Sequence, residues 1–266
     1  MELIDLLAHL AVLGRDNGEA FTCTDRLDRI ASLLRGTAYR QIPADGLFHL
    51  YGKRMPREVS GPVTVISSHA DCHMDITRCF SRMEDAEHLR GTYDNLATNA
   101  AAVSLMLGGS LPQNVFFAFT GDEEDDMTGT IELARYLRRE KIQARIIVLD
   151  VTEMGWAEHA DFTIENNFWT EAMGKAVARC AEESGYAWRF VPANPDDVPA
   201  YIPRAAVIPE EAWCDESWEY DEAEIPCFSL CIPCYGEMHS DAGVLIRRRA
   251  LVRYAEVLER MALALG

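Results

Sequence analysis

The sequence predicts an α/β fold, a three-layer α/β/α sandwich around a mixed, mostly parallel sheet. Short, nearly continuous apolar runs recur at residues 62–66, 115–119 and 146–149, and such runs are typical of strands buried on both faces. Helix-like segments lie between the runs, and alternation of strand with helix indicates a parallel sheet. A chain of 266 residues can bury the core of one such domain, so we expect a single domain over residues 1–266.

Each expected element follows from a local pattern. Leucines and isoleucines at intervals of three and four residues predict two amphipathic helices near the start of the chain, within residues 3–13 and 27–34. Residues 47–51 alternate loosely, as a strand does. Helical composition and spacing then predict helices at 97–107, 127–140 and 170–184, a strand at 227–232, and a closing helix at about 241–265 with Val244 on its inner stripe.

Residues 192–225 show no clear periodicity. They contain five prolines and the acidic and aromatic run Trp213–Tyr220. The segment is longer than the usual connection between elements, which favours a functional role over a simple linker. We therefore expect an insertion or flap that faces the substrate.

Charge and cysteine usage exclude several classes of partner. The chain has 25 basic and 43 acidic residues, a formal net charge of −18, which repels nucleic-acid phosphates and anionic lipids. No apolar run is long enough to span a membrane, and Glu2 and Asp5 stand where an export signal would carry positive charge. Eight irregularly spaced cysteines are typical of reduced thiols. We expect a cytoplasmic protein with no nucleic-acid or membrane partner.

Imidazole or carboxylate groups follow every strong strand. Because the carboxyl ends of parallel strands meet at one edge of a sheet, these side chains should converge there. Nitrogen and oxygen donors of this kind bind zinc in catalytic sites, and divalent cations would offset the repulsion between the carboxylates. The residues at the strand ends are His69, Asp71, Glu123, Glu124, Asp150 and His239.

A two-metal hydrolytic site also needs a ligand that bridges the ions. Asp94 suits this role, because its loop precedes the 97–107 helix and should lie between the first two strand ends. Glu123 and Glu124 are adjacent on an expected turn, where consecutive side chains diverge. One can therefore bind metal while the other acts as a general base.

The ordered motifs resemble those of the co-catalytic zinc aminopeptidases, whose fold is the zinc-peptidase, phosphorylase/hydrolase-like sandwich. The resemblance extends over about residues 63–243 and includes both the single-domain bacterial leucyl aminopeptidases and the tetrahedral glutamyl or deblocking aminopeptidases. Its motifs are His69-Ala-Asp71, Asp94-Asn95, Glu123-Glu124, Asp150-Val-Thr and Ile232-Pro-Cys-Tyr-Gly-Glu-Met-His239-Ser.

The resemblance implies a role for each of these side chains. One zinc would take His69, Asp94 and Asp150, and the other would take Asp94, Glu124 and His239. Glu123 would be the general base, and Asp71 would orient His69.

The chain departs from that pattern in two places. The tetrahedral enzymes insert a domain between the positions of His69 and Asp94, whereas only 24 residues intervene here. This favours the single-domain architecture and removes support for a large tetrahedral assembly, so any homo-oligomer should be small. The Ser-Asp-His motif of the single-domain enzymes has only a weak echo at Cys214–Ser217, which leaves the substrate preference open.

The predicted function is two-metal hydrolysis of small peptides or aminoacyl substrates, with zinc, cobalt or manganese. An aminopeptidase must bind a substrate ammonium group, for which Glu216, Glu219 and Glu237 are candidates. A deacylase or carboxypeptidase on the same scaffold is the alternative, and a carboxypeptidase would need a cation such as Arg78 or Arg90. A non-catalytic metal-binding relative is a further alternative.

Other interpretations apply to individual motifs. His73-Met-Asp75 repeats the His-x-Asp pattern of His69, although His69 lies nearer the strand end. The acidic run 122–126 is also typical of a solvated helix cap, as Asp94 and His239 are of turns and caps. Cys231-Ile-Pro-Cys234 matches half of a structural zinc site, but a second such pair is missing, so buried thiols are expected.

Overall fold

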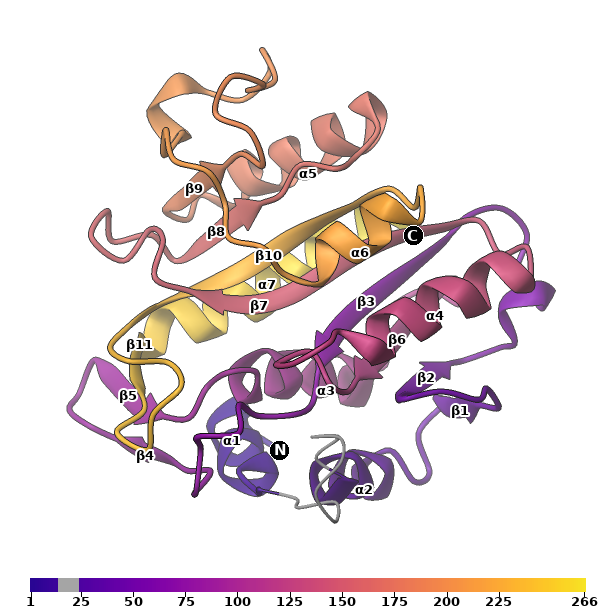
Figure 1. Cartoon of the computed structure of the whole chain (residues 1–266), viewed down its shortest axis with the longest axis horizontal. Coiled ribbons are helices and arrows are strands. Elements are labelled where there is room, and N and C mark those ends of the chain that lie inside the picture. Colours follow the sequence, from indigo (N-terminus) through magenta and orange to yellow (C-terminus); the bar gives the residue numbers. More distant parts are fainter. Residues whose placement is uncertain (14–23) are drawn as a thin grey trace.

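The structure, a computed structural model, describes residues 1–13 and 24–266 and holds an 11-stranded mixed sheet with helices on both faces (Figure 1). The strands run in the order β1-β2-β6-β3-β7-β10-β11-β5-β4. In addition, β8 pairs with β10, and β9 pairs with β8. The predicted three-layer α/β/α fold is confirmed. The strands are β1 (Arg40–Ile42), β2 (Phe48–Gly52), β3 (Val63–His69), β4 (Ser81–Met83), β5 (His88–Gly91), β6 (Val115–Thr120), β7 (Ala144–Thr152), β8 (Phe162–Glu165), β9 (Trp188–Val191), β10 (Cys227–Tyr235) and β11 (Val244–Arg247).

The centre of the sheet consists of four parallel strands, β6, β3, β7 and β10. β3 and β6 are buried along their whole length, which explains why they are nearly continuous apolar runs in the sequence. The register pairs His69 with Thr120 of β6 and Asp150 with Cys231 of β10. Pairing of Ser67 with Val148 brings His69 level with Asp150. The ends of all four strands therefore meet at one edge.

Helices pack against both faces of the sheet. α4 and α6 cover one face, and the other helices cover the opposite face. The neighbouring residues Phe116 and Phe117 of β6 point into the two different cores, as successive strand residues do. The helices are α1 (Leu3–Leu10), α2 (Thr24–Leu33), α3 (Leu96–Gly108), α4 (Thr128–Arg139), α5 (Glu171–Ser184), α6 (Glu216–Glu222) and α7 (Arg248–Leu265).

The ends of several helices have identifiable causes. The Thr170 hydroxyl accepts a hydrogen bond from the Met173 backbone N–H and caps α5, and α5 ends before Gly185, which has a φ of 71°. The helix expected within residues 3–13 ends at Leu10. None of the described helices is long and apolar enough to cross a membrane.

One predicted boundary was wrong. The closing helix begins at Arg248 and not near residue 241, and Val244 belongs to strand β11. β11 pairs with both β10 and β5, so hydrogen bonds to two distant strands outweigh the local helical spacing. The segment between His69 and Asp94 contains the antiparallel pair β4 and β5.

Candidate metal centre

The predicted site residues converge at the edge where the four parallel strands end. His69 is the last residue of β3, Asp150 lies near the end of β7, and Asp94 precedes α3. Glu123 and Glu124 occupy the turn after β6, and His239 lies in the loop after β10. Segments that are far apart in the sequence thus bring these side chains to one place.

Asp94 lies between two imidazole rings. Its Oδ1 atom is 3.0 Å from His69 Nε2, and its Oδ2 atom is 3.4 Å from His239 Nε2. His239 Nε2 is also 3.3 Å from Glu124 Oε2. A carboxylate whose two oxygens face two different imidazoles has the arrangement expected of a bridging ligand.

The remaining carboxylates surround His69. Its Nε2 atom is 3.8 Å from both Glu123 Oε2 and Asp150 Oδ1. On the other side of the ring, Nδ1 lies 3.3 Å from Asp71 Oδ1. Asp71 also accepts a hydrogen bond from the Glu124 backbone N–H at 3.2 Å, so it links the segment after β3 to the turn after β6.

Buried hydrogen bonds hold the segments that carry these groups. Asn99 donates to the His69 carbonyl at 2.6 Å, and Asn95 donates to the Leu149 carbonyl at 2.6 Å. These bonds fix α3, and with it Asp94, against β3 and β7. The peptide bond between Asp94 and Asn95 is cis.

The electrostatics of the cluster favour a cation. Burial raises the pKa of Glu124 to about 10, that of Asp150 to about 7, and that of Glu123 well above its usual range. Burial also disfavours charge on Asp94, but His239 and His69 hold the pKa of that carboxyl well below its ordinary value. Crowded carboxylates of this kind become stable in the ionised form next to a divalent cation.

The donor atoms also fit a metal ion. His69, Asp94 and Glu124 each offer one ligand atom, and these atoms all lie within 4.8 Å of one another. His69 Nε2, Asp94 Oδ1 and Glu124 Oε1 are buried and form no hydrogen bond within the described part of the chain. Buried polar atoms without hydrogen bonds are costly unless another partner satisfies them, and a cation would do so.

A cleft of about 140 Å³ opens onto the cluster. Among its described lining residues there is no lysine or arginine. Trp213, Cys214 and Asp215 come from the 192–225 segment. They lie in the part of it that connects β9 to α6. Besides the cluster, the acidic side chains of the lining are Glu153, Glu165 and Asp215.

Two buried acids of this cleft did not figure among the predicted site residues. Glu165 ends β8, is 2% exposed and accepts a hydrogen bond from the Thr163 hydroxyl at 2.5 Å; burial raises its pKa to about 8. Burial likewise raises the pKa of Asp215. Glu165 follows the rule that a polar residue ends an apolar strand, but β8 has only four residues and gives a weak sequence signal.

The residues of the alternative interpretations do not belong to the group of close donor atoms. Glu216 accepts hydrogen bonds from the Thr120 and Thr130 hydroxyls and does not line the cleft. His73 stacks on His239 with ring centroids 4.2 Å apart and lies outside the group of close donor atoms. Burial raises the pKa values of Cys231 and Cys234 well above the usual range, as expected of inert thiols.

Searches with protein-family models and among curated proteins find no match, but solved structures match over nearly the whole chain. A TET aminopeptidase from a marine sediment archaeon of the Thaumarchaeota is 9% identical, with a TM-score of 0.71 over 98% of this chain and 96% of that one. The chain shares the fold of this aminopeptidase.

Two further structures agree. An aminopeptidase from the archaeon Desulfurococcus kamchatkensis is 10% identical, with a TM-score of 0.70 over 98% of this chain and 94% of that one. The LapA aminopeptidase of Legionella pneumophila is 11% identical, with a TM-score of 0.62 over 99% of this chain and 68% of that one. The shared fold thus accounts for nearly all of both archaeal chains and for a smaller share of LapA.

Proposed function

We propose that this chain is a metal-dependent hydrolase of peptide and amide bonds, most specifically an aminopeptidase that acts on small peptides. The observation that carries the proposal is the position of the Asp94 carboxylate between His69 and His239, with further carboxylates around it. The fold shared with solved aminopeptidases supports the same function.

The residues present fit two metal ions. His69, Asp94 and Asp150 would hold one, and Asp94, Glu124 and His239 would hold the other. Zinc matches the nitrogen and oxygen donors best, and cobalt or manganese could replace it. When bound, such ions supply Lewis-acid chemistry that polarises an amide carbonyl and acidifies water.

Glu123 is the proposed proton carrier. Its Oε2 atom is 3.8 Å from His69 Nε2, so the Glu123 carboxylate faces the centre. Glu123 does not belong to the group of close donor atoms formed by His69, Asp94 and Glu124. Burial raises its pKa, which favours proton uptake near neutral pH. Glu123 would take a proton from the attacking water and deliver it to the leaving amine, while Asp71 keeps the His69 ring in place.

The lining of the cleft favours substrates with a free amino group. A peptide ammonium would be attracted to Glu153 and would favour the ionised forms of Glu165 and Asp215, whereas a substrate carboxylate would meet no lysine or arginine among the described lining residues. This favours an aminopeptidase over a carboxypeptidase. Because Trp213 and Asp215 belong to the 192–225 segment, we propose that this segment is a flap that faces the substrate.

The proposal also covers the assembly and the cellular location of the enzyme. The Pyrococcus horikoshii TET1 peptidase, which shares the fold, can assemble into a tetrahedron or a large octahedral shell. For this chain we propose a small homo-oligomer located in the cytoplasm. We also propose that each copy of the chain forms one domain over residues 1–266.

The first experiment measures hydrolysis of leucine p-nitroanilide and its N-acetyl form by metal-stripped protein, before and after addition of zinc, cobalt or manganese. Glu123→Gln should lose nearly all turnover but keep its metal, since its role is proton transfer. Glu182→Gln, an exposed change on α5, is the matched control and should keep full activity.

The outcomes separate the alternatives. Release of acetate from the N-acetyl substrate, without release of p-nitroaniline from the free-amine form, would replace the aminopeptidase with a deacylase. Two bound metals without turnover on a broad panel of amides would favour a non-catalytic relative. Loss of metal from Glu123→Gln would show that Glu123 is a ligand and not the proton carrier.

The metal ligands have a test of their own. Metal content after dialysis, measured by mass spectrometry, should fall in His69→Ala and in His239→Ala. His73→Ala is the control, because His73 stacks on His239 but lies outside the donor group. If His73→Ala lost metal while His69→Ala kept it, the ligand assignment would be wrong.

A further inference from the structure

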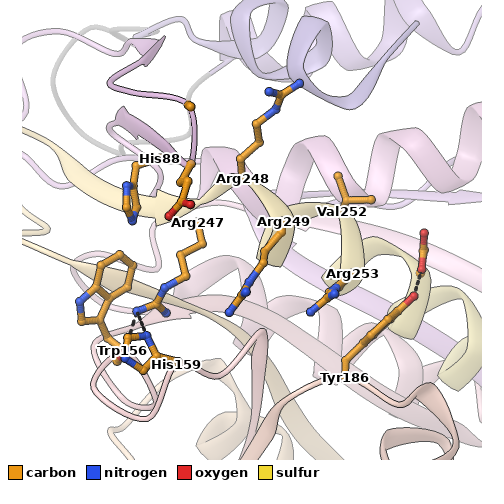
Figure 2. A pocket seen from close by; sticks show the side chains of 12 residues that line it. His88, Trp156, His159, Tyr186, Arg247, Arg248, Arg249, Val252 and Arg253 are labelled. Atoms are coloured by element: carbon orange, nitrogen blue, oxygen red, sulfur yellow. Dashed lines mark hydrogen bonds between the residues drawn. The ribbon is translucent and has the colours of Figure 1, made fainter.

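A second cavity, of about 900 Å³, lies at the start of α7 and is basic (Figure 2). Four arginines from a stretch of seven residues line it, although the whole chain has a formal net charge of −18. The turn after β7 separates it from the metal-site cleft, because Glu153 lines the cleft while Trp156 and His159 line this cavity. The arginines are Arg247, Arg248, Arg249 and Arg253.

Arg247 is the most buried of the four, at 8% exposed. Its guanidinium lies 3.8 Å from the centre of the Trp156 ring, and Nη2 donates to the Trp156 carbonyl at 2.8 Å. Nη1 is buried and has no hydrogen-bond partner within residues 1–13 and 24–266. A buried guanidinium N–H without an acceptor is costly, and rotation of the Arg247 side chain toward the cavity would let a ligand oxygen supply the missing partner.

Arg249 and Arg253 are positioned by a shared counter-ion. Asp161 is fully buried, and its two oxygens lie 3.3 Å from Arg249 Nε and 2.7 Å from Arg253 Nη1. Arg253 also stacks over the Tyr186 ring at 4.9 Å. Each guanidinium has five N–H donors, so both retain further donors beside these contacts. Figure 2 shows the guanidinium groups of Arg247, Arg249 and Arg253 along one side of the cavity.

Acidic side chains offset only part of this charge. Glu87 and Glu256 line the cavity, and Glu256 accepts a hydrogen bond from the Tyr186 hydroxyl. The lining thus contains two carboxylates and four arginines, and the buried Asp161 pairs with Arg249 and Arg253. Burial and the nearby Arg249 lower the pKa of Arg247, whereas Asp161 raises it.

We propose that this cavity binds a small anionic molecule, whose phosphate or carboxylate oxygens accept hydrogen bonds from Arg247 and Arg249. Planar guanidinium groups bind both kinds of oxyanion through paired hydrogen bonds. Trp156 and Asp161 hold the two arginines in place before the ligand arrives, which lowers the entropy cost of binding. A concave site of about 900 Å³ matches a small molecule better than a flat protein interface.

The test uses three probes that share an aromatic ring: phenyl phosphate, benzoate and the neutral phenol. Calorimetric titration of the metal-loaded protein should show binding of an anion but not of phenol. The comparison of phenyl phosphate with benzoate tells which oxyanion the site prefers. Arg247→Gln and Arg249→Gln should each weaken anion binding by about tenfold or more, the effect of losing a charge-assisted hydrogen bond.

Controls separate this site from other sources of binding. Arg139→Gln removes a positive charge on α4, next to Glu140, from a side chain that is 62% exposed, against 57% for Arg249, and should leave anion binding unchanged. Anion binding at the metal centre would persist in both cavity variants, so only the arginine-dependent part counts. Since Arg247 is buried and its variant can fail to fold, Arg249→Gln, with a side chain 57% exposed, gives an independent result.

Three outcomes would overturn the proposal. The first is that the protein binds neither anion at millimolar concentration. The second is that Arg139→Gln weakens binding as much as the cavity variants do. The third is that Arg249→Gln dissociates an oligomer while anions remain unbound, which would make this surface a contact between copies of the chain.

Discussion

Glu165 should make the folded protein less stable as the pH rises. This carboxyl group is 2% exposed at the end of β8, and burial raises its pKa from 4.5 to about 8. Negative charge on nearby Asp215 acts in the same direction, although hydrogen bonding by Thr163 opposes it. The folded chain therefore keeps a proton on Glu165 at pH values where the unfolded chain has released it.

The sign and size of the effect follow from this difference. Between pH 4.5 and about 8 the folded state binds one more proton than the unfolded state, so the free energy of unfolding falls as the pH rises. The slope is about 1.4 kcal/mol per pH unit, and the whole window amounts to about 5 kcal/mol. Glu165→Gln cannot titrate, and its amide oxygen can still accept the hydrogen bond from Thr163.

Urea denaturation of metal-free protein at pH 5, 6, 7 and 8 measures this effect. The free energy of unfolding of Glu165→Gln, relative to the unaltered protein, should rise steadily over this range by several kcal/mol. Glu182→Gln, an exposed change on α5, should give a difference that does not vary with pH. If the Glu165→Gln difference were also constant, the carboxyl would be ionised in the folded state and the argument from burial would fail.

Two further predictions concern packing and thiol chemistry. A Cβ at Gly129 would lie 2.4 Å from a backbone carbonyl oxygen, so Gly129→Ala should destabilise the fold by about 2 kcal/mol or more. A Cβ at Gly108 would lie in open space, so Gly108→Ala should stabilise the fold by up to about 1 kcal/mol. Thermal unfolding of the two variants measures both effects. A hydrogen bond from Cys72 lowers the pKa of Cys79 to about 5, while burial raises that of Cys180. Iodoacetamide followed by peptide mass spectrometry should therefore modify Cys79 at pH 6 and Cys180 only at alkaline pH; equal labelling would contradict this.

The parallel centre of the sheet could be predicted from the sequence, because β3, β6 and β7 are buried on both faces and therefore form nearly continuous apolar runs. β8 and β11 could not. Each has only four residues, and each is stabilised by antiparallel pairing with β10. β10 is distant from β8 in the sequence and is separated from β11 by a turn. Such strands depend on non-local hydrogen bonds that leave little trace in local composition.

The same reasoning explains which site residues could be found. His69, Asp150 and the Glu123-Glu124 pair follow long parallel strands, so the common direction of the strands is enough to bring them together. The basic cavity gave no such signal, since Arg247 and Arg249 look like ordinary surface residues in the sequence. Only Trp156 and Asp161, from a different part of the chain, give them a buried and ordered setting.

Glu165 and Glu216 show where sequence reasoning has a physical limit. Both are buried acids that accept hydrogen bonds from threonine hydroxyls. Glu216 accepts from Thr120 and Thr130 and does not line the cleft, whereas Glu165 accepts from Thr163 of its own strand and lines the cleft. Which acid can meet a substrate ammonium group thus depends on whether packing pairs it with donors away from the cleft or leaves it at the cleft. That pairing is a property of the packed fold, so an acidic residue in the sequence identifies a candidate anchor but not its availability.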